Sequence, residues 1–500
     1  MTAEQLRNSL LQEAIQGKLV PQDEKETASE LVLRLQNALK TSSIKKKWDA
    51  EAIQEDELPF DIPGNWQWLR LGDIVFTQTG LSYSKGYLEK KVANPVRVLR
   101  GGNIQNGSWC IKDDDVMIAP EFVKKDIFLK KNSFITPAVT SLEHLGKTAL
   151  IREDHNDIVA GGFVLYLMPY DATNDELMEY LAYFFQSALY NSFCKTITNK
   201  SGQAFWNISR EKLLQLPIPL PPLAEQQRIV AKLEELLPIV EQYGKAQTEL
   251  NELNAALPSR LRQSILQQAI QGKLVPQDKN ETVDELVHSL QRALKESPIK
   301  KKWCPEEIQE DELPFDIPDN WKWVRLGDII YTQTGLSYSK GDLEKKVANP
   351  VRVLRGGNIK NGSWCIKDDD VMIAPEFVKK DIFLKKNCFI TPAVTSLEHL
   401  GKTALIREDH NDIVAGGFVL YLMPYDATND ELMEYLAYFF QSALYNSFCK
   451  TITNKSGQAF WNISREKLLQ LPIPLPPLAE QQRIVAKIEE LFAEIDKLTK

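Results

Sequence analysis

The sequence predicts an α+β protein made of two near-identical domains joined by helices. The chain repeats itself without a gap, so that residues 1–245 correspond to 256–500. Each repeat holds a long stretch of short apolar runs between polar turns, and an apolar period of seven residues follows it. A repeat of this length indicates duplication of a whole domain rather than a stack of small units.

The two copies must fold alike, because they are almost the same sequence. Between Val92 and Lys232 only two positions differ from the second copy: Gln105 faces Lys360 in the alignment, and Ser133 faces Cys388.

Composition places the chain among soluble proteins with more than one domain. Of its 500 residues, 43% are hydrophobic and 26% are charged, and the clearly apolar runs are too short to span a bilayer. Its 6 cysteines show no Cys-x-x-Cys spacing, which favours free thiols in a reducing compartment. We therefore expect a cytoplasmic protein without a membrane partner.

The net charge of −8 argues at first against a nucleic-acid partner, because phosphate binding needs a local positive potential. However, residues 65–218 and 320–473 carry nearly equal numbers of basic and acidic side chains, so the acidic excess lies elsewhere. A DNA-contacting face on these two segments is compatible with the composition.

The first part of each repeat is polar. Residues 17–64 predict one helix, opened by the capping box "TASE" at 27–30, within a partly ordered linker. The second copy has "TVDE" at the same place, starting at Thr282.

Residues 65–219 predict the folded domain. Runs such as "WLRLGDIVF", "VRVLRGG" and "IVAGGFVLYLMP" are separated by Gly, Asn and Asp, a pattern typical of strands and turns. One helix is expected over 174–194. Together these patterns indicate a compact α+β domain with a mixed sheet.

The region after the domain predicts a long helix with a coiled-coil seam. Apolar residues recur every seven positions, and Gln247 and Asn254 are polar seam positions that cost stability but fix the register. A globular helix with a broad polar face is the alternative. The predicted seam consists of Ile229, Leu233, Leu236, Val240, Tyr243, Leu250, Leu257 and Leu261.

This central helix is expected from about Leu223 to Leu257, with Pro258 opening a further turn. Its counterpart is split between the two ends of the chain, which would come together to complete an antiparallel helical pair with pseudo-two-fold symmetry. The expected boundaries are N-terminal helix 1–18, linker 19–64, domain 65–218, helical spacer 219–273, linker 274–319, domain 320–473 and C-terminal helix 474–500.

Motifs for phosphate or metal binding are weak. The stretch "SLEHLGKTAL" ends like a phosphate-binding loop, but Ser141 stands where that loop needs a glycine, so a turn before a strand at 147–151 is favoured. The acidic run Asp113–Asp115 is expected to be a solvated turn, since no further ligand follows at a diagnostic spacing. Neither His144 nor His155 shows the spacing of zinc ligands.

We therefore expect no catalytic, cofactor-binding or metal-binding residue in this chain. Two alternatives stay open: a scaffold without a nucleic-acid role, and an enzyme with a cryptic nucleotide or nuclease site near Lys147 and Lys402.

Three polar segments of each domain carry side chains of the types that contact DNA. In the first domain, residues 79–86, 96–107 and 198–209 combine glycine-bearing backbone with the side-chain types that bind phosphates and base edges. An ordinary polar loop is the alternative for each residue, and a solvent-facing strand residue for Arg97. The candidates in the first domain are Tyr83, Lys85, Arg97, Arg100, Asn103, Gln105, Asn106, Lys200, Ser201 and Gln203. Those in the second are Tyr338, Lys340, Arg352, Arg355, Asn358, Lys360, Asn361, Lys455, Ser456 and Gln458.

Several longer motifs are more specific. "NWQWLRLGDI" opens each domain in this or a near-identical form, "GNI" lies within it, and "SGQAFWNISREKLLQLPIPLPPLAEQQRIV" closes it. These motifs, with a second such domain after a helix, resemble the specificity subunit of type I restriction-modification systems over essentially the whole chain. The resemblance implies that each domain is a target-recognition domain for half of a bipartite DNA sequence, and that the helices act as a spacer and dock two methyltransferase subunits.

The resemblance also implies that catalysis belongs to other subunits. Methylation would use S-adenosylmethionine in the methyltransferase subunits, and ATP-driven translocation and cleavage would use the restriction/translocase subunits with Mg²⁺. The expected partners are double-stranded DNA, two DNA methyltransferase subunits and the restriction subunits, and no cofactor is expected in this chain.

In this family the two recognition domains usually differ, whereas here they nearly coincide. Two equal readers related by a two-fold axis imply an interrupted near-palindrome. A helix of about 35 residues would be about 50 Å long at 1.5 Å per residue, enough to separate half-sites by roughly one turn of DNA. Gln105 against Lys360 is expected to relax the symmetry, because Lys favours guanine where Gln favours adenine or only touches a phosphate.

Overall fold

The computed structural model describes the chain in two compact units, Met1–Leu250 and Asn251–Lys500. It describes all residues except 45–47, 49–50, 85–93, 124, 142–143, 202–204, 300–302, 305, 340–348, 379–381, 397–398, 457–459 and 499–500. The second unit repeats the elements of the first. None of the helices in the described residues combines the length and apolar character needed to cross a membrane.

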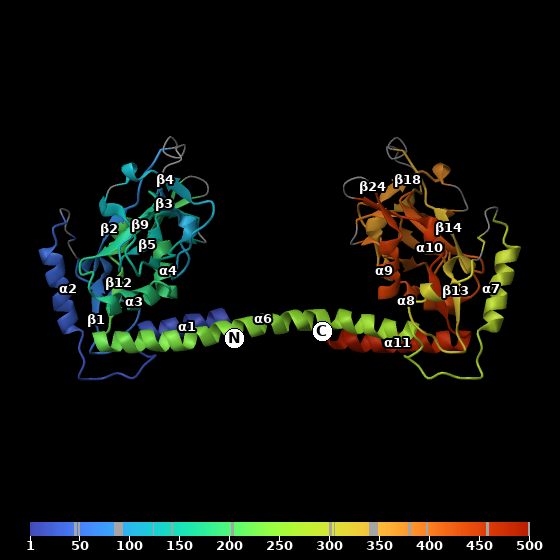
Figure 1. Ribbon diagram of the computed structural model, residues 1–500, viewed down its shortest axis with the longest axis horizontal. Helices are drawn as coiled ribbons and strands as arrows, with labels where there is room; N and C mark the ends of the chain where they lie inside the picture. The colour runs from blue at the N-terminus through green and yellow to red at the C-terminus, as the bar shows by residue number, and fades with distance from the viewer. Residues whose placement is uncertain are drawn as a thin grey trace. The chain divides into compact units, whose positions relative to one another are not determined.

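The first unit has six helices or parts of helices in the described residues. They are α1 (Ala3–Ile15), α2 (Ser29–Thr41), α3 (Asp175–Phe184), α4 (Ala188–Thr196), α5 (Arg210–Leu214) and the first part of α6 (Leu223–Ile270). In this unit α1 and α6 run along one end of a set of small sheets, and α2 lies at one side of it (Figure 1). The second unit holds the rest of α6 with α7 (Asp284–Glu296), α8 (Asp430–Phe439), α9 (Ala443–Thr451), α10 (Arg465–Leu469) and α11 (Leu478–Leu498).

The strands form several small sheets rather than the one mixed sheet that was expected. In the first unit β1 (Gln67–Arg70) pairs with β12 (Pro217–Leu220). The larger sheets have the orders β2 (Val75–Thr79), β9 (Val164–Pro169), β5 (Phe134–Pro137), β7 (Ala149–Leu150); β4 (Val116–Ile118), β3 (Val96–Leu99), β8 (Ile158–Ala160); and β10 (Thr198–Ser201), β11 (Phe205–Ile208), β6 (Val139–Thr140). Only the β4–β3–β8 sheet is mixed among the described residues of this unit, because β3 and β8 run parallel and the other neighbours antiparallel.

The second unit has the same sheets 255 positions later, with one added hairpin of β16 (Ile359–Lys360) and β17 (Ser363–Trp364). The equivalent strands are β13 (Lys322–Arg325), β14 (Ile330–Thr334), β15 (Val351–Leu354), β18 (Val371–Ile373), β19 (Phe389–Pro392), β20 (Val394–Thr395), β21 (Ala404–Leu405), β22 (Ile413–Ala415), β23 (Val419–Pro424), β24 (Thr453–Ser456), β25 (Phe460–Ile463) and β26 (Pro472–Leu475).

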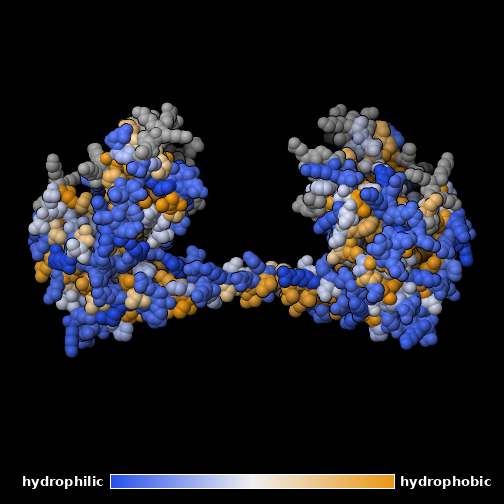
Figure 2. Space-filling view, viewed as in Figure 1, coloured by the Kyte–Doolittle hydropathy of each residue, from blue (hydrophilic) through white to orange (hydrophobic). Residues whose placement is uncertain are grey.

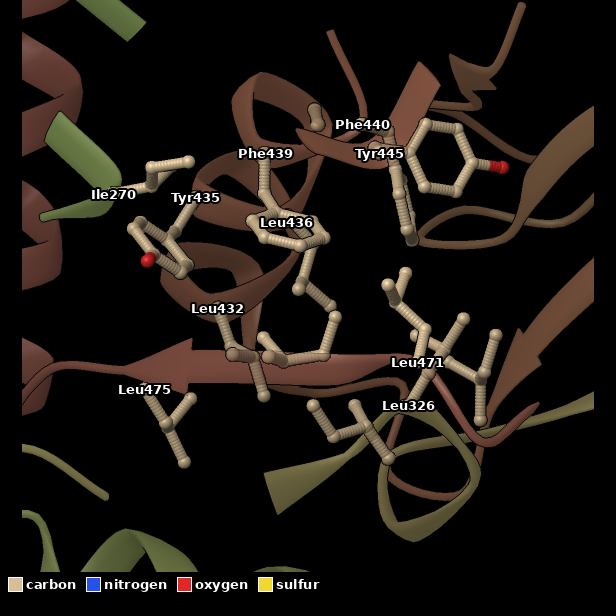
Figure 3. Close-up of a cluster of buried hydrophobic side chains, with 14 of the residues drawn as sticks. Ile270, Leu326, Leu432, Tyr435, Leu436, Phe439, Phe440, Tyr445, Leu471 and Leu475 are labelled. Carbon is tan, nitrogen blue, oxygen red and sulfur yellow. The ribbon is translucent and has the colours of Figure 1, made fainter. Parts of the chain in front are cut away.

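Aromatic and aliphatic side chains from α8 and its neighbours form the core of the second unit. Figure 3 shows the ring of Tyr435 beside Ile270 of α6, with Leu475 of β26 below them. The Tyr435 hydroxyl donates a hydrogen bond of 2.6 Å to the carbonyl of Pro474, so this fully buried tyrosine keeps its polar atom satisfied. The core therefore fastens the domain directly onto α6.

The segment 19–64 is part of the folded unit rather than a linker. Leu31 and Leu35 of α2 are buried in the core, and the Trp48 indole packs against Gly72 and donates to the Asp73 carboxylate at 3.1 Å. The helix in this segment was predicted correctly, but the capping box was not. Helix α2 begins at Ser29 after Ala28, which makes no side-chain cap.

The single helix expected over 174–194 is two helices. The break lies at Ser187, whose hydroxyl accepts a hydrogen bond of 3.3 Å from the backbone N–H of Tyr190 and so caps α4. Serine competes for backbone hydrogen bonds and favours caps over helix interiors, which explains why an apolar periodicity did not carry through this position.

The repeated join "PLPPLAEQQ" seats the first turn of α6 in the domain. Glu225 and Gln226 are fully buried. The Trp66 indole donates to Glu225 at 2.9 Å, and the Gln226 amide donates to the Pro221 carbonyl at 2.9 Å. Burial raises the pKa of Glu225, and the hydrogen bonds from Trp66 and Gln22 partly offset this.

Helix α6 is longer than predicted. It continues through Pro258 to Ile270, a total of 48 residues. In the first unit α1 lies along its first part, where the Tyr243 hydroxyl donates to the Met1 carbonyl at 3.0 Å (Figure 1). In the second unit α11 lies along its last part, where the Arg262 guanidinium stacks 4.5 Å from the ring centre of Phe492. That the two ends of the chain meet stays a prediction.

The predicted seam divides into two parts. Ile229 and Leu233 are buried in the core of the first unit, and Leu236, Val240 and Leu261 are half-buried. The remaining seam residues are exposed: Tyr243 by 41%, Leu250 by 56% and Leu257 by 46%. Figure 2 shows hydrophobic atoms at the surface along the middle of α6, so a coiled coil in this part stays a prediction.

Candidate nucleic-acid interface

The segments predicted to contact DNA meet around the turn between β8 and β9. The run "IVAGGFVLYLMP", one of those typical of strands and turns, holds two strands, β8 and β9, and residues 161–163 separate them. The carbonyl of Leu99 accepts from Gly161 at 2.8 Å, and the carbonyl of Phe163 accepts from Ala138 at 2.8 Å. The N–H of Leu81 donates at 2.7 Å to the last carbonyl of β8. The turn is thus held by three neighbouring segments.

Each predicted segment is represented among these neighbours. Leu81 belongs to 79–86 and Leu99 to 96–107, while Val139, the residue after Ala138, pairs with Asn207 of 198–209. In the first unit the strands β3 and β4 lie at the end of the domain away from α6, and β18, the equivalent of β4, lies at the same end of the second unit (Figure 1). Chain topology therefore gathers three distant segments at one end of the domain.

A pocket of about 590 Å³ opens beside this turn. Tyr83, Arg100 and His144 line it together with Phe163 and the glycine backbone on either side. The second unit has the equivalent pocket of about 620 Å³ around Tyr338, Arg355, His399 and Phe418. Of the predicted candidates, Tyr83 and Arg100 and their equivalents are thus brought together in this pocket.

Arg97 and Asn103 are held by a buried carboxylate. The Asp115 side chain is fully buried. Its carboxylate accepts a hydrogen bond of 3.1 Å from the Arg97 guanidinium and one of 2.6 Å from the Asn103 amide. Burial raises the pKa of Asp115, but the hydrogen bonds from the Lys112 backbone, Asn103 and Arg97 together lower it by more. The pKa of Asp115 therefore lies below its ordinary value. The solvated turn expected at 113–115 is therefore wrong for Asp115.

Asn103 is also corrected as a candidate. It is 1% exposed and donates a second bond to the Cys110 carbonyl at 3.0 Å. Asn358 has the same burial and the same bonds in the second unit, where Arg352 pairs with Asp370 at 3.1 Å. These asparagines are buried and hold the loop through their side-chain hydrogen bonds.

Arg100 is exposed and pairs with a neighbouring exposed carboxylate. Its ion pair with Asp114 at 2.9 Å joins side chains that are 44% and 76% exposed, and such exposed pairs contribute little to stability. Arg355 makes the same pair with Asp369 at 3.0 Å.

The next candidates lie on a loop in the first unit and at the β16–β17 hairpin in the second. Gln105, Asn106 and the equivalent Lys360 and Asn361 are exposed. Gln105 accepts a long hydrogen bond of 3.5 Å from Ser108. Lys360 is backbone-paired with Ser363 in the β16–β17 hairpin, but its side chain makes no hydrogen bond or ion pair with another described residue.

The third segment is a hairpin, in which Lys200 and Ser201 of β10 pair with β11, and Lys455 and Ser456 of β24 pair with β25. The Lys455 side chain is exposed. The remaining candidates, Lys85, Gln203, Lys340 and Gln458, lie outside the described residues.

Sequence reasoning missed the turn itself. Phe163 is 70% exposed and Phe418 is 72% exposed, although both stand inside an apolar run. The signal was the Gly161–Gly162 pair, since two glycines within a strand pattern indicate a break or a close backbone approach.

The stretch near Lys147 does not form a phosphate-binding loop. Gly146 adopts a φ of 75°, and the short strand β7 follows, as predicted, instead of the helix that such a loop needs. His155 packs edge-on against Trp109 at 5.5 Å. Within the described ranges no group of three His, Cys, Asp or Glu side chains is placed to hold a metal ion.

Comparison with known proteins agrees with this architecture. A family model described as the type I restriction modification DNA specificity domain matches residues 63–252 and 318–500. The EcoAI specificity subunit of Escherichia coli is 28% identical over 99% of this chain and 89% of its own length. The EcoEI specificity subunit, also of Escherichia coli, is 23% identical with the same coverage.

A crystal structure of the HsdS subunit from Thermoanaerobacter tengcongensis aligns with 89% of this chain and 93% of that chain, at 18% identity and a TM-score of 0.45. The family model covers most of the chain in two matches. The chain therefore belongs to the family of type I restriction-modification specificity subunits and carries the DNA specificity domain twice.

Proposed function

We propose that both units read the same short DNA sequence, so that the target is bipartite and nearly palindromic. The observation that carries this proposal is the near identity of the two candidate interfaces, which differ at Gln105 and Lys360 among the described candidates. Equal side chains on equal folds present the same hydrogen-bonding pattern to base edges, and so prefer the same bases.

The inverted order of the half-sites is supported by the two roles of α6. Its first part lies beside α1 in the first unit and is equivalent in sequence to α11. Its last part lies beside α11 in the second unit and is equivalent to α1. In the first unit α6 thus takes the place that α11 has in the second, and in the second unit it takes the place that α1 has in the first. We therefore expect the two half-sites on opposite DNA strands, with several unread base pairs between them.

In this proposal the chain is the non-catalytic, DNA-reading subunit of a cytoplasmic complex. Two methyltransferase subunits supply methylation with S-adenosylmethionine, and restriction subunits supply ATP- and Mg²⁺-dependent translocation and cleavage. The exposed side chains of Leu250, Leu253 and Leu257 on α6 support docking of protein partners there, since neighbouring exposed apolar residues mark interaction surfaces.

Genome-wide mapping of adenine methylation tests the proposal. A host that expresses this chain with its methyltransferase partner should gain one bipartite motif whose two halves are reverse complements, or differ at a single base. A host that expresses the methyltransferase alone is the control and should lack the motif. Two unrelated half-sites would contradict the shared reading, and no new motif would contradict the DNA-reading role.

A further inference from the structure

Phe163 and Phe418 occupy an unusual position for aromatic residues. Each is at least 70% exposed, although removing a phenylalanine side chain from water is strongly favourable. Among the residues that line the first pocket, Phe163 is the one large hydrophobic residue that is exposed. The other apolar residues of this pocket, Leu81, Tyr83, Val139 and Val164, are half-buried or buried, and the remaining lining residues are polar or glycine. The exposed ring is therefore not flanked by other exposed apolar side chains of the pocket, as it would be in the contiguous apolar patches that mark protein interfaces.

The backbone that carries Phe163 is held rigidly. Its carbonyl accepts from Ala138 at 2.8 Å, and the turn closes with a 2.8 Å bond from Val164 to Gly161. At Gly162 a Cβ atom would lie 2.8 Å from the Ser82 hydroxyl, so the turn packs closely on its neighbours. A rigid turn presents the ring at little entropic cost on binding.

The chemistry around the ring fits DNA. Arg100 lines the same pocket, and its exposed ion pair with Asp114 is readily exchanged for a phosphate. Proteins that deform DNA insert an apolar side chain between two stacked base pairs and hold the flanking phosphates with cations.

We propose that Phe163 and Phe418 insert between base pairs of the two half-sites and partly unstack one base step in each. This inference rests on the proposed DNA-reading function and specifies how each unit engages the duplex. The occupant of the site is double-stranded DNA, and Arg100 and Arg355 hold phosphates beside the opened step.

The test uses the chain assembled with its methyltransferase partner, without S-adenosylmethionine, on duplexes that carry the mapped motif. Phe163→Ala and Phe418→Ala should each weaken specific binding about tenfold to a hundredfold, because each removes the burial of one aromatic ring. The salt dependence should stay the same, since no phosphate contact is lost. Phe163→Leu should recover part of the affinity.

Unstacking has its own readout. 2-Aminopurine placed at successive positions, other than the methylated base, should brighten at one step in each half-site with the wild-type chain. Each single alanine variant should lose one of the two signals, and the double variant both. Ile111→Ala is the matched control, because Ile111 is 55% exposed in the same domain but does not line the pocket. It should change neither affinity nor fluorescence.

The outcomes separate this inference from the proposed function. Selective binding by wild type with unchanged affinity or unchanged fluorescence in the alanine variants overturns the inference alone. An effect of Phe163→Ala on assembly with the methyltransferase, but not on DNA, likewise overturns it. Wild-type complex that binds no duplex selectively overturns the proposed function.

Discussion

Asp115 and Phe163 show how differently the fold uses two residues that lie in the same domain. Asp115 stands in an acidic run that looks solvated in sequence, yet its carboxylate is buried and organises the loop through Arg97 and Asn103. Phe163 stands in an apolar run that looks buried, yet its ring is exposed. In both cases a distant segment decides the environment, because local polarity says nothing about which residues pack there.

The loop should lose stability when the buried carboxylate is replaced. Asp115→Asn leaves Arg97 without its charged partner, and we expect a loss of about 1–3 kcal/mol in the free energy of unfolding of the first unit at neutral pH. Chemical denaturation measures this loss. Asp113→Asn is the control, because Asp113 is exposed in the same run. Equal stability of Asp115→Asn and wild type would show that the pair contributes nothing.

The pH dependence follows from the direction of the pKa shift. The pKa of Asp115 is lowered by folding from its ordinary value of 3.8, so the folded state favours the charged carboxylate. The stabilisation is therefore present above pH 3.8 and is lost as the pH falls through the lower folded pKa. The difference between wild type and Asp115→Asn should shrink over that range in thermal melts.

At the scale of elements, the existence of a helix was predicted more reliably than the residues at which it begins and ends. The helix of segment 19–64 and the long central helix both exist, but α2 lacks its predicted cap and α6 runs on to Ile270. The helix over 174–194 is broken at Ser187. Periodicity reports a helical face over several turns, whereas a helix end depends on one or two hydrogen bonds that periodicity does not contain.

The packing of α2 can be tested with two leucines of that helix. Leu35 is 1% exposed, so Leu35→Ala should lower the free energy of unfolding of the first unit by about 2–5 kcal/mol through the cavity that it leaves. Leu33 is 60% exposed, and Leu33→Ala should stay within about 0.5 kcal/mol of wild type. Urea denaturation followed by tryptophan fluorescence measures both. A linker that does not pack on the domain would make the two variants equal.

At the scale of the whole molecule, the two units are close copies whose described candidate residues differ at one position. The Lys360 side chain is exposed and has no hydrogen-bond or ion-pair partner among the described residues, whereas the Gln105 side chain contacts its own loop through Ser108. The other difference between Val92 and Lys232, Ser133 against Cys388, is fully buried in both units. Any inequality between the half-sites that arises from these two differences should therefore come from position 105.

Gln105→Lys should make the two interfaces equivalent. If wild type methylates half-sites that differ at one base, the variant should methylate a perfect palindrome, as read by methylation mapping. Ser133→Cys removes the buried difference and should leave the motif as it is. A motif that Gln105→Lys does not alter would mean that position 105 takes no part in base reading.

The candidate site was predicted in part. Tyr83 and Arg100 were predicted because aromatic and basic residues in glycine-bearing loops are typical of DNA contacts, and they line one pocket. That they contact DNA stays a prediction. Asn103 was predicted as a DNA contact but is buried, and the sequence could not show this, because an amide that reads adenine and an amide that holds a loop are the same side chain. The turn at Phe163 was missed, since an apolar run gives no sign of which residue stays outside the core.

The sequence by itself determined the duplication, the family, the α+β class and the near equality of the two interfaces, because each of these depends on residue identity and order alone. The tertiary structure decided which side chains are buried, where helices end, and that three separated segments meet at the β8–β9 turn. Those properties depend on contacts between residues far apart in the chain, and local pattern does not specify such contacts.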